Sequence, residues 1–196
     1  MPRAGRVRPD PADVLRDRGL LLLSDNTLPS LATIVAGEPV RGSWWGHPRS
    51  HEIFAAARRL ARDPEAVAIP LVNAKITFVH RELWPALLAV ARTRASWQTR
   101  GLTAAARTLL KRVERAGELE TSGRAAHELE RRLLVTSREV HTDRGAHAKI
   151  AESWERWATR MRVAPLDDVD AARRELEDAA ATLGPRAKLP WQAVPV

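Results

Sequence analysis

The sequence predicts an α+β, mainly helical protein. Its 196 residues are enough for one domain or two small ones. Amphipathic helical periodicity alternates with short β-hairpin patterns. Residues 10–80 have the order short helix, possible strand, short helix, longer helix, hairpin, and residues 102–152 have the order helix, short strand, helix, hairpin. That order is typical of a winged helix-turn-helix unit, so we expect one or two such units with short hairpin wings, plus a C-terminal helix.

The first unit is expected to open with a short helix that starts at Asp10-Pro11 and ends near Gly19. The four leucines at 20–23 that follow form either a buried strand or the end of that helix, because four residues are too few for a periodicity. A second short helix is expected from Thr27 or Pro29 onward.

A longer amphipathic helix is predicted over 49–62, followed by a β-hairpin over 66–80 that turns at Asn73-Ala74. The helix is expected to bury one apolar side and to carry arginines on or near the other. The predicted buried side holds Ile53, Phe54, Ala57, Leu60 and Ala61, and the arginines are Arg58, Arg59 and Arg62.

The segment 81–94 is predicted to be a helix buried between the two halves, because it is apolar on more than one face. Residues 97–101 are expected to connect it to the second unit. Thr103 caps the next helix and Gly117 stops it.

The second unit continues with a short strand at 118–121 and a candidate recognition helix at 123–134. Its wing is expected to turn through Thr142-Asp143-Arg144-Gly145. A helix capped by Ser153 and a last helix over 167–183 complete the pattern.

These elements predict five regions along the chain. They are a disordered basic arm at 1–9, a first winged-helix-like unit at 10–80, a connecting helix at 81–101, a second unit at 102–161, and a C-terminal helix with a Pro-rich tail at 162–196.

The charge of the chain is uneven. The formal net charge is +8, and residues 81–160 carry 16 basic and 10 acidic side chains, a net +6. A basic surface is the usual electrostatic footprint of a nucleic-acid binder. The basic residues are 28 Arg and only 4 Lys, a bias that a GC-rich genome also produces, so composition leaves both interpretations open.

A winged helix lays one helix into the major groove of DNA and uses basic side chains around it to neutralise phosphates. Arg144 at the wing tip is the sharpest candidate, because arginine can enter a minor groove. Ion pairs between Glu128 and Arg131 or Arg132 on the helix surface are the competing interpretation. The candidate nucleic-acid contacts are Arg107, Lys111, Arg124, Arg131, Arg132, Arg138, Arg144 and Lys149.

The loop Gly42–Pro48 holds two adjacent tryptophans between glycines. We expect burial at a seam between domains, and stacking on a nucleobase is the alternative. The candidate pocket residues are Trp44, Trp45, His47 and His51.

The sequence indicates no metal site and no cofactor. His47 and His51 have the i, i+4 spacing of metal ligands, but Pro48 separates them and no third ligand is evident; His141 and His147 flank the wing turn and could face each other. Without cysteine there is no disulfide or thiolate site, and neither a nucleophile elbow nor a phosphate-binding glycine loop is present.

Two stretches, GSWWGHP with KITFVHRELWPALLAVA, and LERRLLVTSREVHTDRGAHAKIAESWERWA, resemble segments of uncharacterised actinobacterial proteins with a winged-helix-like pattern. The second is also similar to the winged-helix portions of the bacterial DNA glycosylases that unhook crosslinks, which are built of tandem winged helices. That family carries a Gln-x-Gln catalytic motif. Gln98 and Gln192 are the only glutamines here and are far apart, so no active-site residue is carried over.

These observations favour a non-enzymatic DNA-binding protein of regulation or repair. The alternatives are a glycosylase-type hydrolase acting on nucleic acid, with a site near Gly42–Pro48, and a protein-interaction scaffold; whether any catalysis occurs is left open. We expect a cytoplasmic bacterial protein with DNA as partner and no membrane contact, because the chain lacks a secretory signal and a long apolar run. The oligomeric state is not predicted.

Overall fold

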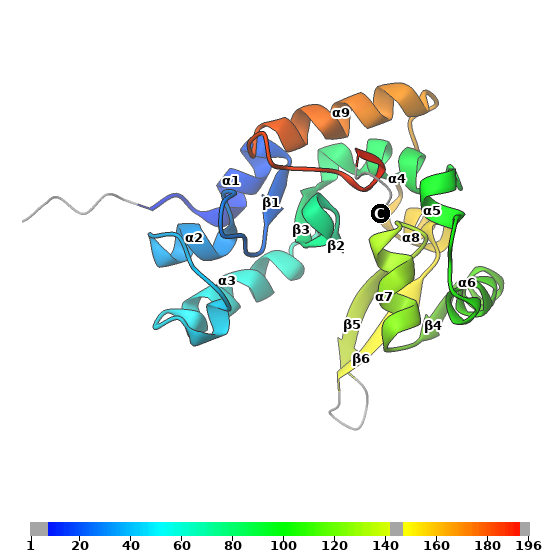
Figure 1. The fold of residues 1–196 in the computed structure, drawn as a ribbon, viewed down its shortest axis with the longest axis horizontal. Coiled ribbons are helices and arrows are strands. Elements are labelled where there is room, and N and C mark those ends of the chain that lie inside the picture. The colour runs from blue at the N-terminus through cyan, green and yellow to red at the C-terminus, as the bar shows by residue number, and fades with distance from the viewer. Residues whose placement is uncertain (1–7, 142–146, 193–196) are drawn as a thin grey trace, which may run out of the picture.

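The computed structural model describes residues 8–141 and 147–192, and it shows an α+β, mostly helical protein with two small three-stranded antiparallel sheets (Figure 1). Helix accounts for 52% and strand for 15% of the chain, so the predicted fold class is confirmed at this level. Most of the predicted basic arm and the wing turn at 142–145 lie outside the described residues.

The first half follows the predicted order of elements. Its sheet has the order β1-β3-β2, with β3 antiparallel to both neighbours. The leucines at 20–22 form β1, which settles the question that the sequence left open. The elements are α1 (Pro11–Arg18), β1 (Leu20–Leu22), α2 (Leu31–Ala36), the 3-10 turn η1 (Trp44–Gly46), α3 (Ser50–Ala61), β2 (Ala66–Pro70), the 3-10 turn η2 (Val72–Ala74) and β3 (Ile76–His80).

The second half repeats this arrangement with one helix fewer. Its sheet has the order β4-β6-β5, so in both halves the last strand lies between the other two. The hairpin register pairs His141 with His147. The elements are α6 (Ala104–Ala116), β4 (Glu118–Glu120), α7 (Arg124–Arg131), β5 (Thr136–His141) and β6 (His147–Glu152).

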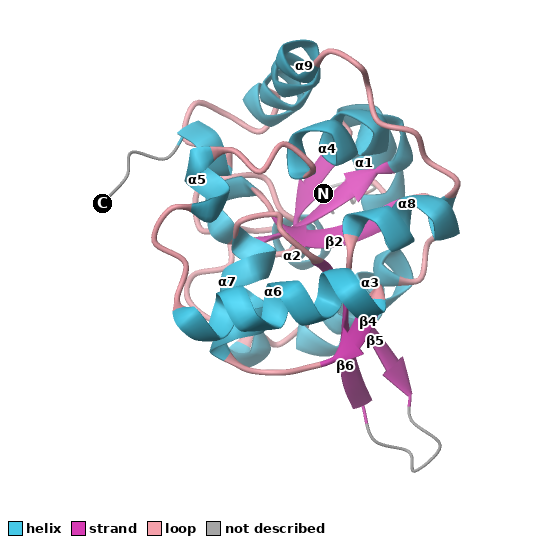
Figure 2. Ribbon diagram, turned by 90° about the vertical axis from the view of Figure 1, so that its right-hand side faces the viewer, coloured by secondary structure: helices cyan, strands magenta, loops and turns pink. Residues whose placement is uncertain are grey.

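The remaining helices join the halves. They are the 3-10 turn η3 (Arg81–Leu83), α4 (Trp84–Ala91), α5 (Ser96–Thr99), α8 (Trp154–Met161), α9 (Val169–Ala181) and the 3-10 turn η4 (Pro190–Gln192). Helix α9 packs along α4 and spans both halves, as the two views show (Figures 1 and 2). The predicted connector at 97–101 is partly helical, because α5 ends at Thr99 and includes three of its residues. Trp191 holds the C-terminal segment in place, because its indole N–H donates to Glu177 of α9 over 2.6 Å.

Three apolar clusters form the core. One lies under α1–α3, one between α6, α7 and the second sheet, and the largest covers the other face of the first sheet. Helix α4 belongs to the largest cluster, and every residue of it except Pro85 is buried, as its apolar character predicted. Trp157 of α8 contacts Trp84 of α4 edge-on, with ring centroids 5.3 Å apart, so α8 and α4 share this central cluster. No helix in the described part of the chain is both long and apolar enough to cross a bilayer.

A buried carboxylate explains why α2 starts later than predicted. One oxygen of Asp25 accepts hydrogen bonds from the backbone N–H groups of Thr27 and Leu28, which fixes these residues in a turn. The helix therefore begins only after Ser30, whose hydroxyl caps it by accepting from the N–H of Thr33. The other Asp25 oxygen lies 2.6 Å from the ammonium of Lys75.

Replacing Asp25 by Asn should lower the free energy of unfolding at pH 7 by about 2 kcal/mol. Burial alone would raise the pKa of Asp25, but the Lys75 ammonium and the backbone N–H groups outweigh it and lower the pKa from 3.8 to about 2. A lowered pKa stabilises the fold above the unfolded-state value, and this stabilisation is lost as the pH falls from about 4 to about 2.

Urea denaturation of both proteins at pH 7 and pH 2 measures this effect, and the difference between them should shrink at the lower pH. An Asp13→Asn variant is the control, because its ion pair with Arg16 is exposed on both sides and should matter little. An equal difference at the two pH values would contradict the assignment.

Candidate nucleic-acid interface and the adjoining cleft

Helix α6 is amphipathic, with an apolar inner face and a basic outer face. Thr103 caps it by accepting from the N–H of Ala106, and Gly117 ends it at a φ of 80°, a conformation that glycine adopts without strain. The buried residues Ala106, Leu109, Leu110 and Val113 pack in the cluster that α6 shares with α7. The exposed basic residues are Arg107, Lys111, Arg112 and Arg115.

The basic residues of segment 100–132 lack acidic partners. Within the described ranges, none of the eight has a carboxylate oxygen within 4 Å. Three of the five acidic side chains in this segment pair with cations from elsewhere, since Glu114 binds Arg94, Glu118 binds Arg138 and Glu130 binds Lys149. We call these eight residues the α6–α7 basic surface: Arg100, Arg107, Lys111, Arg112, Arg115, Arg124, Arg131 and Arg132.

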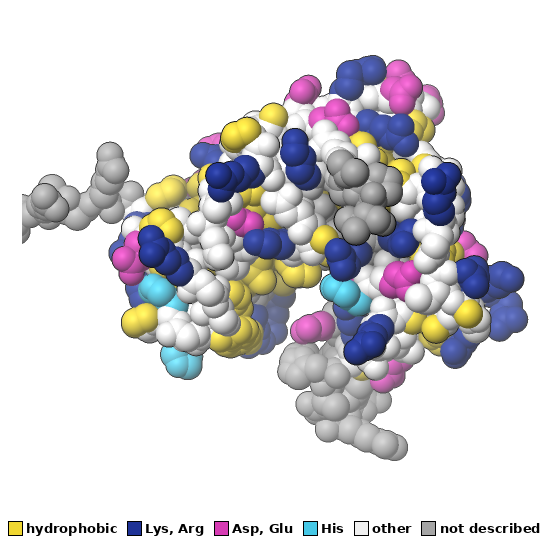
Figure 3. All heavy atoms as spheres, viewed as in Figure 1, with side chains coloured by type: hydrophobic (Ala, Val, Ile, Leu, Met, Phe, Trp, Pro, Cys, Tyr) yellow, Lys and Arg dark blue, Asp and Glu magenta, His cyan; other side chains and the backbone are white. Residues whose placement is uncertain are grey.

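The two helices that carry most of this surface pack against each other, and Figures 1 and 2 show them side by side. Figure 3 shows dark blue side chains gathered at the right-hand edge of the molecule, where Figure 1 places α6. Two members are oriented by backbone carbonyls. Arg107 donates to the carbonyl of Leu102, and Arg132 donates to those of Trp97, Gln98 and Arg100.

Helix α7, the predicted recognition helix, presents Arg124, His127 and Arg131 to solvent. The predicted ion pairs from Glu128 to Arg131 or Arg132 are absent from the described structure. Glu128 instead accepts hydrogen bonds from the N–H and hydroxyl of Thr103, so it supports the start of α6. Because both donors are uncharged, Glu128 keeps its negative charge on α7.

Two of the predicted wing residues, Arg138 and Lys149, form ion pairs with carboxylates of the same chain. Arg138 lies 2.9 Å from Glu118, and Lys149 lies 2.6 Å from Glu130, whose side chain is buried. The hydrogen bond from Arg138, together with Arg156, holds the pKa of Glu118 below its usual value. Arg138 and Lys149 are therefore weaker candidates for phosphate contacts than α6 and α7 residues, and Arg144 lies outside the described residues.

The tryptophan pair is not buried at a seam, and that expectation was wrong. The 3-10 turn η1 lies on α3 and leaves 61% of Trp45 exposed, while Trp44 is half-buried against the first core cluster. The two rings are stacked with centroids 4.0 Å apart. Phe54 of α3 continues the series, with its ring centroid 5.5 Å from that of Trp45.

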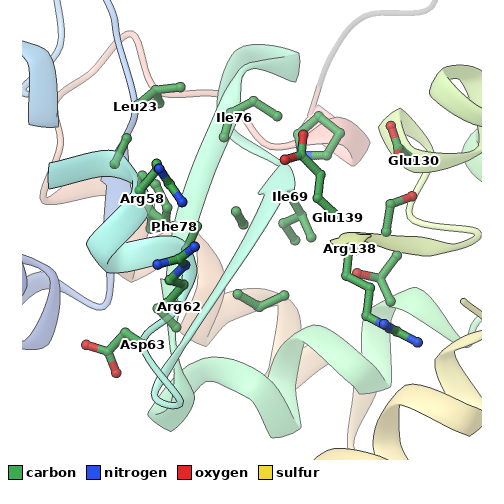
Figure 4. Close-up of a pocket in the computed structure, with 18 of the residues that line it drawn as sticks. Leu23, Arg58, Arg62, Asp63, Ile69, Ile76, Phe78, Glu130, Arg138 and Glu139 are labelled. Atoms are coloured by element: carbon green, nitrogen blue, oxygen red, sulfur yellow. The ribbon is translucent and has the colours of Figure 1, made fainter. Parts of the chain in front are cut away.

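These aromatic rings border a cleft between the two halves with a volume of about 800 Å³. Its first wall comes from η1, α3, β2 and β3, and its second wall from α7, β5, β6 and α8. Figure 3 shows the hollow, with apolar side chains gathered on the first wall. In Figure 4, Arg58 and Arg62 extend from α3 on one side, and Arg138 and Glu139 extend from β5 on the other.

Phe54, Arg58 and Arg62 are cleft residues that the sequence analysis did not assign to a site. Phe54 was predicted to face the core, yet it is 40% exposed, because Ile53 and Leu60 already fill the interior beneath α3. The three residues repeat every four positions and so form one stripe along the helix. That spacing was readable from the sequence, but nothing in it showed that the stripe faces a second unit.

The candidate pocket histidines do not line this cleft. His47 is half-buried, and its Nδ1 accepts from the N–H of Arg49 over 3.1 Å. His51 is exposed in the first turn of α3. Within residues 8–141 and 147–192, no three histidine or acidic side chains gather as a metal site would require. The side chains of His141 and His147 lie outside the description.

The buried carboxylates at the cleft are engaged in ion pairs. Glu130 binds Lys149, and Glu152, which is 1% exposed, binds Arg160 over 2.7 Å. The hydrogen bonds that Arg160 donates to Glu152 raise the pKa of Arg160. A general acid or base needs a carboxyl group that can exchange a proton with the substrate, so these two pairs give no support to hydrolysis.

Comparison with known proteins adds no assignment. No protein-family model matches the chain, and no curated protein and no solved structure is significantly similar to it. The resemblance to the crosslink-unhooking glycosylases therefore stays a prediction.

Proposed function

We propose that the protein binds duplex DNA through the α6–α7 basic surface, as a non-enzymatic DNA-binding protein of regulation or repair. The observation that carries this proposal is the set of eight cations at 100–132 that, in the described structure, have no carboxylate within 4 Å. Charges left without internal partners repel one another, and a phosphate backbone relieves this repulsion while releasing its own counterions.

The topology supports a winged-helix assignment. The first half has the order helix, strand, two helices, hairpin, and the second half has the order helix, strand, helix, hairpin. In each half the last strand lies in the middle of the sheet. The second half has one helix, α7, between its first strand and its hairpin, whereas the first half has two. In such a unit the helix before the hairpin enters the major groove, whose width admits a helix. Here that helix is α7, with Arg124 and Arg131 exposed at its two ends.

The surface favours phosphate contacts over base reading. Phosphate contacts set position and affinity, whereas sequence is read by side chains at base edges. Six of the eight cations lie on the two helices, four on α6 and two on α7. The four on α6 lie along its outer side. We therefore expect substantial affinity with modest sequence preference.

Arginine footprinting tests this proposal. The protein is treated with phenylglyoxal alone and with a random-sequence duplex, and mass spectrometry gives the modification of each arginine. The duplex should protect Arg107, Arg112, Arg115, Arg124 and Arg131. Exposed Arg162 and Arg186, which have no ion pair within the described ranges, are internal references that should react equally in both samples. Absence of protection on α6 and α7 would contradict the proposal and favour a protein-binding role.

A further inference from the structure

The exposed aromatic side chains converge on one place. Four large hydrophobic residues are prominently exposed in the described structure, and three of them, Trp45, Phe54 and Ile76, line the cleft between the halves. The fourth, Leu166, lies elsewhere at 36% exposure. Exposed apolar residues that cluster in a concave region mark a binding site more often than scattered ones do.

The Trp45 ring is held in place by the neighbouring Trp44 ring. Trp44 stacks on it with ring centroids 4.0 Å apart and planes at 24°, and Trp44 itself packs against the buried cluster of the first half. Phe54 also lies against this ring, tilted by 42°, and 61% of Trp45 stays exposed. A largely exposed ring that its neighbours hold in place is suited to stacking on another flat ring. Nucleobases stack on aromatic side chains in this way, largely without regard to sequence.

Two cations lie beside these rings. The Arg58 guanidinium carbon is 5.6 Å from the Phe54 ring centroid, and Arg62, the C-cap residue of α3, follows one turn later. Neither has a carboxylate within 4 Å in the part of the chain that the structure describes. Side chains four residues apart on a helix are neighbours, so this pair can hold successive phosphates of one strand.

The charged side chains that line the cleft bear on its occupant. Arg138, Lys149 and Arg160 are paired with carboxylates, which leaves Arg58 and Arg62 as cations on the α3 side, with Asp63 beside them and Glu139 on the opposite wall. An apolar peptide segment would cover Arg58 and Arg62 without neutralising them, and desolvating unpaired charges opposes binding. A nucleic-acid strand satisfies both features, because its bases are flat and its phosphates are negative. The opposite wall carries the acidic Glu139, so the phosphates are expected along α3, where Arg58 and Arg62 lie.

We propose that this cleft binds single-stranded nucleic acid, with an unpaired base stacked on Trp45 and phosphates held by Arg58 and Arg62. A base inside a duplex cannot present its face, so the site selects single strands or bases that have left the stack. The cleft and the α6–α7 basic surface share no residue. This second site therefore goes beyond duplex binding and does not depend on it.

Binding of a fluorescein-labelled oligothymidine, which forms no duplex, tests the proposal by anisotropy. Trp45→Ala should weaken binding by about tenfold. The double variant Arg58→Gln/Arg62→Gln should reduce the slope of log affinity against log salt by about 1.4. Trp45→Phe should retain most of the affinity, because a phenyl ring still stacks. Thermal unfolding by circular dichroism confirms that each variant is folded.

Leu166→Ala is the matched control, since it removes an exposed apolar side chain outside the cleft and should leave oligothymidine affinity unchanged. Failure of the wild-type protein to bind oligothymidine overturns the proposal, as does unchanged affinity in Trp45→Ala or an equal loss in Leu166→Ala. Duplex affinity measured on the same variants keeps the two proposals apart. Trp45→Ala should leave it unchanged, and loss of duplex binding alone would count only against the α6–α7 basic surface.

Discussion

Replacing Gln98 by methionine should lower the free energy of unfolding by about 3 kcal/mol. Methionine has a similar length and volume, so the change removes hydrogen bonds with little change in packing. Chemical denaturation of the purified variant measures the loss.

The size of this effect follows from the position of the Gln98 amide. The side chain is fully buried, and its N–H groups donate to the carbonyls of Ala91, Arg132 and Leu133, the first over 2.9 Å. Its oxygen accepts from the N–H of Ala95 and the hydroxyl of Thr93. One amide thus joins the end of α4, the start of α5 and the turn after α7. Methionine would leave several buried polar groups without partners, and each such group costs about 1–3 kcal/mol.

The chain provides its own control in Gln192, the only other glutamine. That side chain is exposed and accepts one hydrogen bond, from the N–H of Leu189. Gln192→Met should therefore change stability only slightly. If Gln98→Met lowered the free energy of unfolding no more than Gln192→Met, the hydrogen bonds of the Gln98 amide would not stabilise the contact between α4, α5 and the turn after α7.

The triple variant Arg107→Gln/Lys111→Gln/Arg115→Gln should bind duplex DNA more weakly by on the order of a hundredfold at roughly 0.1 M salt. The three residues lie at i, i+4 and i+8 on the exposed side of α6, so they face the same ligand. If each contacts one phosphate, the slope of log affinity against log salt should become shallower by about 2.7. The fold should be unaffected, since the buried face of α6 is unchanged.

A second triple variant separates local contacts from net charge. Arg162→Gln/Arg186→Gln/Lys188→Gln removes the same three charges from exposed positions outside the α6–α7 basic surface. It should lower affinity only slightly and leave the slope nearly unchanged. Equal losses in both triple variants would mean that the protein attracts DNA through its net charge alone.

Local signals in the sequence were sufficient to predict most helices. The cap at Thr103, the stop at Gly117 and the apolar face between them located α6, and the same reasoning located α3 and α9. The hairpin over 66–80 was also confirmed, with Asn73 at the turn in a left-handed conformation. These features depend on residues a few positions apart, which is why the sequence shows them.

The partners of the charged side chains could not be predicted in this way. Arg138 pairs with Glu118, and Lys149 with Glu130, across about twenty residues of chain. Arg132 reaches carbonyls more than thirty positions away. Sequence shows where charges are, but only the fold shows which of them neutralise each other. For this reason the predicted nucleic-acid contacts divide into exposed residues of α6 and α7 and internally paired residues of the second sheet.

The exposure of Trp45 and Phe54 could not be predicted for a similar reason. Both residues were expected to be buried, because large aromatic side chains usually are. Their positions follow from the way η1 lies on α3 and from the cleft that faces α3, which are long-range features of the fold.

The salt dependence of duplex binding by the unmodified protein tests the central claim most directly. With about five cations of the α6–α7 basic surface on phosphates, log affinity should fall linearly with log salt at a slope of about −4.5. No binding at low salt, or an affinity that does not change with salt, would contradict the account and leave the +8 charge as a property of composition.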